Sequence, residues 1–452
     1  MKSKSAFQLV RTGSRAACIL AAATAALLSA HSVHAATFVW ANSNVTGATP
    51  ATSLNWFNAT QGAWSPSTPV SGNTNTIQFF QDVTTALGNT GGSGNSQTSV
   101  IDNGGSPFQI GTLTLSGLAS ATTGANLAMT ISGDALDFSG ATGRINLDAL
   151  NATRTLTYNL NSNIQLGTVG SGSALTLAGN GTGTFNIGGI ISELQSGGGS
   201  LIKNGSSTVS LTGANTYTGA TTVNAGILNL SGNGSIATST GLTLNGGGLT
   251  LTNTTTAEGG IDRVGAVGIT SNGGTITYNN TSAANTYAEV LGAVTLTTGQ
   301  LNVVSTNAAT AGGTETLTLG AGSLTHAAAN TSAITFSGAS LGAGITNSII
   351  VTSQATTDTG TIIGPWATFG TTAVLQSDYA TYNITGGVSN AYGIQNANIA
   401  ATTDVNWMDS TKAYTSNVGG ALALVASTHN MLGLRNTGAT TVMTIPLSLI
   451  HI

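Results

Sequence analysis

The sequence predicts an all-β protein, a right-handed parallel β-helix that begins with a tryptophan-rich N-terminal cap. The 452 residues include 62 glycines and 40% hydrophobic residues but only 5% charged residues, a composition too apolar for a disordered chain. Short apolar/polar alternations are separated by glycine and asparagine, which is typical of strands joined by sharp turns. No proline occurs from residue 108 to residue 364. This suits continuous strand pairing, because proline cannot donate to a β-ladder.

Residues 1–35 have the pattern of a secretory signal peptide. The apolar run 16–30 follows a basic start, and small residues at 33–35 fit a signal peptidase site. The one cysteine, Cys18, lies at the start of the apolar run. A lipoprotein cysteine follows such a run, so we do not expect lipid attachment, and the mature chain has no disulfide. The basic residues of the start are Lys2, Lys4, Arg11 and Arg15.

The mature chain is acidic and sparsely charged. Removal of the signal leaves six basic residues against fourteen acidic ones, a net charge of −8. A basic footprint for nucleic acid or anionic lipid is therefore absent. No later stretch of the sequence is long and apolar enough to span a membrane.

Residues 36–105 are predicted to form the N-terminal cap and entry region. Trp40, Trp56 and Trp64 all fall in this region, together with three of the six prolines. The first coil of a solenoid needs a cap, since it would otherwise leave an open strand edge and a bare core. The alternative is that the three tryptophans form a platform for stacking on sugars, and we favour the cap.

Residues 106–360 are predicted to be the β-helix repeats. Glycine-containing turns followed by strands recur, as in VNAGILNL at 223–230, LNGGGLTL at 244–251 and SNGGTITY at 271–278. A period in the low twenties is typical of rungs whose loops vary while the core strand is kept. A β-sandwich also has short strands, but it would not need one repeated unit over so long a stretch. The predicted equivalent residues, separated by 21, 27, 25 and 23 positions, are Leu228, Leu249, Ile276, Leu301 and Leu324.

The segment 197–230, GGGSLIKNGSSTVSLTGANTYTGATTVNAGILNL, is the most regular part of the chain. Three apolar/polar alternations are joined by corners in which Gly and Asn permit positive φ. This segment closely resembles the autotransporter-associated β-strand repeat, with Ile202 where that family usually has Thr. The residues that match are Leu201, Lys203, Gly205, Gly213 through Gly219, Ala225, Gly226 and Leu228.

The resemblance implies a secreted or cell-surface β-helix of the kind found in autotransporter passengers. It implies a Gram-negative-type bacterium and association with the outer membrane or envelope. The link would be a C-terminal outer-membrane barrel or a short sorting tag of the PEP-CTERM kind, and neither is visible here. The resemblance implies no reaction.

The C-terminal part is predicted to hold a junction and further rungs. Residues 361–382 resemble the Gly-Trp-Ala-Thr … Asp-x-Ala-Thr segment that joins β-helical stretches in these proteins, and 383–446 would start a new set of rungs. Residues 447–452, LSLIHI, match one frame of a sequencing-library adaptor. We interpret them as a scar, so we expect the natural chain to continue; a real short strand is the alternative.

The sequence offers no catalytic, cofactor-binding or metal-binding residues. His326 and His429 lie in different predicted rungs without His or Cys at ligand spacing, so we expect no metal site. Asp134 and Asp137 resemble a calcium turn, but the glycine-rich calcium-binding repeat of solenoids is absent. The adjacent pair 262–263, Asp-Arg, is interpreted as an exposed loop salt bridge of little energetic weight.

These observations predict a structural passenger, a β-helical stalk or adhesin without catalysis. Surface glycans or other cells are its expected partners. The alternative is a carbohydrate-active β-helix enzyme, a polysaccharide lyase or glycoside hydrolase, whose carboxylates would gather on one face from distant rungs. Sequence spacing alone does not exclude such a gathering.

The rung register makes a prediction at residue level. Leu228 should point into the core with Leu249 stacked on it one rung later, and Gly226 should occupy the preceding corner. Outward Thr, Ser and Asn should form polar ladders along the coil.

Overall fold

The computed structural model describes most of the chain between residues 35 and 400, and short strands beyond it. The predicted signal, apart from residue 35, and the predicted scar at 447–452 lie outside the described residues. The described ranges are 35–41, 53–57, 64–65, 67–82, 95–118, 127–139, 143–149, 155–167, 173–194, 198–281, 285–307, 313–320, 324–327, 331–339, 341, 346–352, 363–372, 375–384, 391–396, 398–400, 413–416, 422–423, 433–436 and 443–444.

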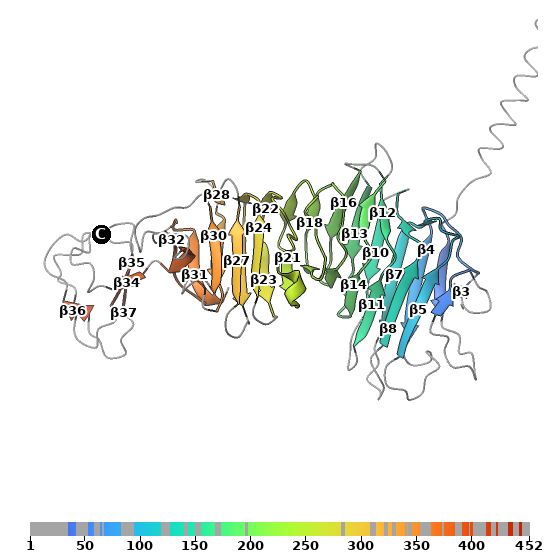
Figure 1. The fold of residues 1–452 in the computed structure, drawn as a ribbon, viewed down its shortest axis with the longest axis horizontal. Coiled ribbons are helices and arrows are strands. Elements are labelled where there is room, and N and C mark those ends of the chain that lie inside the picture. The colour runs from blue at the N-terminus through green and yellow to red at the C-terminus, as the bar shows by residue number, and fades with distance from the viewer. Residues whose placement is uncertain are drawn as a thin grey trace, which may run out of the picture.

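Two long sheets run side by side along the molecule and confirm the predicted parallel β-helix (Figure 1). Sheet A has twelve strands, and its neighbours pair in parallel except at its first edge. In spatial order its strands are β28 (Leu324–His326), β25 (Val294–Leu296), β22 (Ile269–Ser271), β20 (Leu242–Leu244), β18 (Thr221–Val223), β16 (Gly199–Lys203), β13 (Ser173–Ala178), β10 (Gly143–Leu147), β7 (Thr112–Leu118), β4 (Thr76–Asp82), β1 (Thr37–Ala41) and β3 (Trp64–Ser65).

Sheet B has fourteen strands and follows sheet A in each turn of the coil. Its strands are β2 (Ser53–Asn55), β5 (Asn95–Ile101), β8 (Leu127–Gly133), β11 (Leu156–Leu160), β14 (Thr184–Ile187), β17 (Thr208–Leu211), β19 (Ile227–Leu230), β21 (Gly248–Asn253), β23 (Gly274–Asn280), β26 (Gln300–Asn307), β29 (Ala333–Ser337), β31 (Ala367–Thr372), β32 (Leu375–Ile384) and β33 (Ala391–Asn396).

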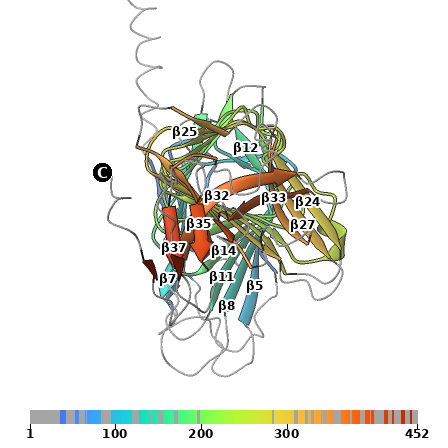
Figure 2. The same cartoon turned by 90° about the vertical axis from the view of Figure 1, so that its left-hand side faces the viewer.

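The third side of the coil changes along the chain. Near the N-terminus it is sheet C, made of β6 (Phe108–Gln109), β9 (Leu136–Asp137), β12 (Ile164–Leu166) and β15 (Ile191–Glu193). Later it is the lobe sheet, made of β24 (Thr286–Leu291), β27 (Thr314–Leu319) and β30 (Asn347–Val351). Seen end-on, β24 and β27 project to one side of the coil (Figure 2). A single turn of 3₁₀ helix, η1 (Thr256–Glu258), precedes the lobe, and no helix of the described residues is long and apolar enough to cross a membrane.

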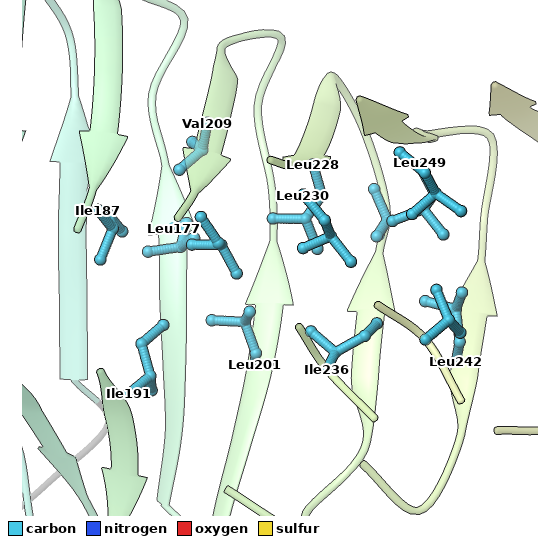
Figure 3. Close-up of a cluster of buried hydrophobic side chains, with 14 of the residues drawn as sticks. Leu177, Ile187, Ile191, Leu201, Val209, Leu228, Leu230, Ile236, Leu242 and Leu249 are labelled. Atoms are coloured by element: carbon cyan, nitrogen blue, oxygen red, sulfur yellow. The ribbon is translucent and has the colours of Figure 1, made fainter. Parts of the chain in front are cut away.

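The inward residues of successive rungs form stacked columns, as strand alternation requires. Leu228 pairs with Leu249, both are fully buried, and the side chains lie one above the other in the core (Figure 3). Leu249 in turn pairs with Ile276. Each such side chain contributes roughly 1.5–3 kcal/mol when it is fully buried. The predicted core positions of Leu228, Leu249 and Ile276 are therefore confirmed.

The predicted register is wrong beyond Ile276. Ile276 pairs with Val303, whereas Leu301 pairs with Gly274, two residues earlier. Leu324 belongs to sheet A and pairs with Val294. The error arises because residues two apart on a strand face the same side, so Leu301 and Val303 are both inward and both buried. A longer excursion through the lobe sheet then moved the next sheet B strand beyond Leu324.

The N-terminal region contributes full strands to both long sheets. β1 pairs in parallel with β4 and antiparallel with β3, so β3 closes the first edge of sheet A. Trp56 is fully buried, donates to Ser99 Oγ at 2.6 Å, and packs 5.3 Å from Trp64 and 5.3 Å from Phe108 between ring centroids. Its ring is therefore not available for stacking on a sugar. The side chain of Trp40 lies outside the described residues, and the tryptophan-rich cap stays a prediction.

Parallel stacking in sheet B ends at β31. This strand pairs in parallel with β29, but β32 is antiparallel to β31 and β33 is antiparallel to β32. Short parallel pairs follow, so strand pairing continues past the antiparallel segment; the predicted domain boundaries remain predictions. These strands are β34 (Asn398–Ala400), β35 (Ala413–Ser416), β36 (Leu422–Ala423), β37 (Gly433–Asn436) and β38 (Met443–Thr444).

Candidate functional site

The outer face of sheet A carries a regular, uncharged array of hydroxyl and amide groups. Thr222, Thr243, Thr270, Thr295 and Thr325 pair in succession on adjacent strands. Stacked identical residues of this kind resemble the side-chain ladders of cross-β assemblies. The predicted threonine ladder is confirmed on this face.

Asparagines form a second ladder beside the threonines. Asn224 donates to Asn204, Asn245 donates to Asn224, and Asn272 donates to Asn245, each at 2.7 Å between amide nitrogen and carbonyl oxygen. An asparagine can donate and accept at once, so one residue type can extend the chain of bonds indefinitely. The face therefore satisfies its own polar groups without charge.

The regular segment forms one complete rung in which Lys203 holds the corners. Lys203 is fully buried although it stands in a core column, between Leu177 and Val223 in register. Its ammonium donates to the carbonyl oxygens of Asn204 at 3.0 Å, Gly205 at 2.9 Å and Ala225 at 3.3 Å. Burial lowers the pKa of Lys203 to about 8. The lysine thus ties the turn of its own rung to the turn of the next.

The glycines of these corners are needed for space as well as for backbone conformation. Gly226 has φ +65°, and a Cβ there would lie 2.4 Å from the carbonyl oxygen of Ser207. Gly205 has φ +75°, and a Cβ there would lie 2.2 Å from the carbonyl oxygen of Gly179. Rungs approach too closely at these points for any side chain, which confirms the predicted role of Gly226.

Asn215 replaces a strand on the third side of this rung. Its side-chain oxygen accepts from the amide of Ile191 at 2.9 Å, and its side-chain nitrogen donates to the carbonyl oxygen of Ser235 at 3.0 Å. The side chain therefore makes the inter-rung bonds that a β-strand backbone would make. Tyr217, two residues on, is fully buried and pairs its hydroxyl with Thr221 at 2.8 Å.

Replacing Lys203 with methionine should lower the free energy of unfolding by about 1–3 kcal/mol, because three carbonyl oxygens lose a donor. Methionine fills similar space and removes the cost of burying a charge, so the loss is partial. Chemical denaturation of residues 36–446 would measure it. An equal or higher stability of Lys203→Met would contradict a net stabilising role for the lysine.

The largest polar cluster of the described residues lies inside the coil, where the lobe begins. Arg263 is fully buried and forms an ion pair with Glu258 at 3.1 Å. The prediction of an exposed 262–263 salt bridge is wrong: Asp262 instead accepts from the amide of Gly265 at 2.6 Å. Adjacent residues in a loop point different ways, so sequence adjacency was misleading. The other acceptors of the Arg263 guanidinium, at 2.8–3.1 Å, are Gly232 O, Gly234 O, Thr252 O and Asn253 Oδ1.

Glu289, on β24, binds the backbone of the same loop. Its carboxylate accepts from the amide of Arg263 at 3.0 and 3.1 Å and from the amide of Val264 at 2.8 Å. Burial raises the pKa of Glu289 to about 8, and these two amides oppose the rise. The lobe is thereby fastened to the coil by a buried carboxyl group.

A third carboxyl group, Glu315 on β27, faces the interior one strand further on. It receives a hydrogen bond from Ser305 on β26 at 2.7 Å. Burial raises the pKa of Glu315 to about 8 as well. The sequence analysis missed all three glutamates.

The structure therefore gathers carboxyl groups from distant rungs, but it gathers them in the interior. Glu258, Glu289 and Glu315 have exposed fractions of 7%, 1% and 0%. A polysaccharide lyase or glycoside hydrolase needs such groups on a face that its substrate can reach. The cluster supplies no such face among the described residues.

The remaining sequence candidates have structural partners. His326 stacks on Trp366 with ring centroids 4.5 Å apart, and its Nε2 lies 2.9 Å from the carbonyl oxygen of Ser332. Asp134 accepts from the amide of Asn103 at 2.6 Å, and Asp137 accepts from the amide of Ser139 at 2.7 Å. Within the described ranges no three His, Cys, Asp or Glu side chains are arranged to hold a metal ion; the remaining candidate, His429, lies outside them.

Comparison with known proteins gives one match. Residues 201–230 match the model of the passenger-associated-transport-repeat family, which confirms the resemblance of this segment to an autotransporter passenger repeat. The match covers the rung held by Lys203, Asn215 and Gly226. No curated protein and no solved structure matches the chain.

Proposed function

We propose that this chain, which carries a passenger-associated-transport-repeat, is a non-catalytic β-helical stalk or adhesin displayed at the cell surface and linked to the outer membrane. The repeat indicates a secreted or surface-exposed autotransporter passenger of a Gram-negative bacterium. The observation that carries the proposal is that this repeat forms one rung of a stack continuing in both directions.

The construction of the coil suits a stalk. Each rung contacts its neighbours, so stability builds up step by step along the axis, and each added rung lengthens the coil by roughly 4.8 Å. The sequence needs no disulfide, since its one cysteine lies in the predicted signal. Such a chain can fold progressively after it emerges from the envelope.

The expected partners are surface glycans or other cells. The threonine and asparagine ladders offer neutral hydroxyl and amide groups in a regular array on one face. Neutral hydrogen-bonding groups match the hydroxyls of a polysaccharide better than they match a charged polymer. Adhesion of cells that display the chain would test this partner class, with cells that lack it as the control.

Surface display can be tested on the full reading frame in a Gram-negative host. An antibody raised against residues 199–281 should label intact cells, and protease added to intact cells should remove the signal. A variant without residues 1–35 should lose both. Labelling that requires broken cells would contradict the proposal.

A further inference from the structure

A chain of three side chains joins the lobe sheet to sheet B in the interior. Ser305 on β26, Glu315 on β27 and Asn347 on β30 are buried, with exposed fractions of 0%, 0% and 1%. The hydroxyl oxygen of Ser305 lies 2.7 Å from Glu315 Oε1 and 2.6 Å from Asn347 Oδ1. Glu315 and Asn347 are also register partners on adjacent strands.

The orientation of the Asn347 amide is determined by its other bonds. Its nitrogen donates to the carbonyl oxygens of Ser305 at 3.0 Å and Ala339 at 2.9 Å. A flipped amide would point its oxygen at two carbonyl oxygens. Oδ1 therefore faces the Ser305 hydroxyl and can only accept from it.

The hydrogens in this chain must be counted next. A serine hydroxyl has one hydrogen, and an ionised carboxylate has none. Ser305 donates its hydrogen to Asn347, so its contact with Glu315 at 2.7 Å lacks a hydrogen if Glu315 is charged. A protonated Glu315 donates to the Ser305 oxygen and completes both bonds. The geometry therefore requires a neutral glutamic acid.

The surroundings of Glu315 favour the same state. Tyr287 on β24 is its register neighbour, and Tyr278 and Glu289 lie close by, with Arg263 beyond Tyr278. Arg263 pairs with Glu258, and no salt bridge to Glu315 exists among the described residues. Burial raises the pKa of Glu315 from 4.5 to about 8, and the backbone amides of Thr306 and Asn280 oppose only part of this rise.

We propose that Glu315 is a proton-dependent latch that closes the lobe sheet (β24, β27 and β30) onto sheet B, and that the lobe loosens when this proton is lost. A charged Glu315 would leave the contact with Ser305 without a hydrogen and would place an unpaired charge in the interior. The lobe lies at one side of the coil (Figure 2), so it can open without dismantling the stack.

The direction of the pH dependence follows from the raised pKa. Between pH 4.5 and about 8, the folded chain holds a proton on Glu315 that the unfolded chain has released. Stability from this group is therefore complete below pH 4.5 and falls as the pH rises towards about 8. The latch is closed in acid and open in alkali.

Hydrogen exchange of the secreted chain at about pH 6 and about pH 9, corrected for the intrinsic exchange rate, tests the latch. Peptides from the lobe sheet should lose roughly tenfold protection per pH unit above the Glu315 pKa, while peptides from β19 and β21 keep theirs. Glu315→Gln cannot ionise, and its amide can donate to Ser305 as the protonated acid does. Its lobe should stay protected at both pH values.

Glu193→Gln is the matched control, because Glu193 lies on β15, outside the lobe, and should leave the wild-type response unchanged. A wild-type lobe with the same protection at both pH values would overturn the proposal. An alkaline opening that persists in Glu315→Gln would also overturn it and would assign the opening to another group, such as Glu289.

Infrared spectroscopy of the wild-type chain keeps the proposal testable if Glu315→Gln fails to fold. A neutral carboxylic acid gives a C=O band distinct from that of carboxylates. The band should be present at about pH 6, where exposed carboxyl groups are ionised, and absent at about pH 9. Its absence at about pH 6 would show that Glu315 is charged and would overturn the latch.

Discussion

Arg263→Met is expected to lower the free energy of unfolding by about 3–5 kcal/mol, because it leaves the buried Glu258 carboxylate without its partner. The guanidinium also holds the carbonyl oxygens of Gly232, Gly234 and Thr252, which would lose their donor. The expected result is a lower denaturant midpoint for residues 36–446, with early loss of protection in 252–265.

Arg144→Met is the matched control, since Arg144 is exposed on β10 and exposed substitutions usually change stability by less than about 0.5 kcal/mol. The double variant Arg263→Met/Glu258→Gln should recover part of the loss by removing the unpaired charge. Equal stability of Arg263→Met and Arg144→Met would contradict the structural role of this ion pair.

Leu228→Ala should cost about 2–5 kcal/mol through lost burial and a residual cavity. Rungs contact only their neighbours, so the damage should remain local along the coil. Limited proteolysis should then cut first between residues 200 and 250. The measurement is the free energy of unfolding together with mass-spectrometric mapping of the first cuts.

Ile227→Ala provides the control one residue away. Ile227 is 39% exposed on the outer side of the same strand, whereas Leu228 is fully buried. The alanine at 227 should have a much smaller effect. Equal effects at the two positions, or cuts confined to the termini, would show that the strand does not face the core as described.

The fold was predictable from the sequence because it repeats a local rule. Alternation placed Leu228, Leu249 and Ile276 inward, and glycine marked the corners where Gly226 has positive φ. The register beyond Ile276 was not predictable, since alternation cannot distinguish Leu301 from Val303 and the lobe sheet lengthens each later rung.

The buried polar cluster was missed because its partners are distant in sequence. Glu289 follows Arg263 by 26 residues, and Glu315 follows Glu289 by another 26, close to the 27 residues between the paired Leu249 and Ile276. Charged residues one rung apart in a chain so poor in charge were the available signal. Reading Asp262 and Arg263 as partners ignored this period.

Lys203 shows a different limit of sequence reasoning. The resemblance marked it as a motif position, but its place inside a core column is not what a charged residue suggests. Only the close approach of two corners, with three carbonyl oxygens aimed at one point, makes a buried ammonium favourable there.

Disulfide trapping between neighbouring rungs tests the stacked coil most directly. Thr222 and Thr243 pair on adjacent strands, at roughly 4.8 Å spacing, within the Cα separation that a disulfide spans. The double variant Thr222→Cys/Thr243→Cys should form an intramolecular disulfide on mild oxidation. Thr222→Cys/Thr270→Cys, two rungs apart, should not. Failure of the first pair, or equal cross-linking of both, would contradict the parallel stack of rungs on which the passenger function rests.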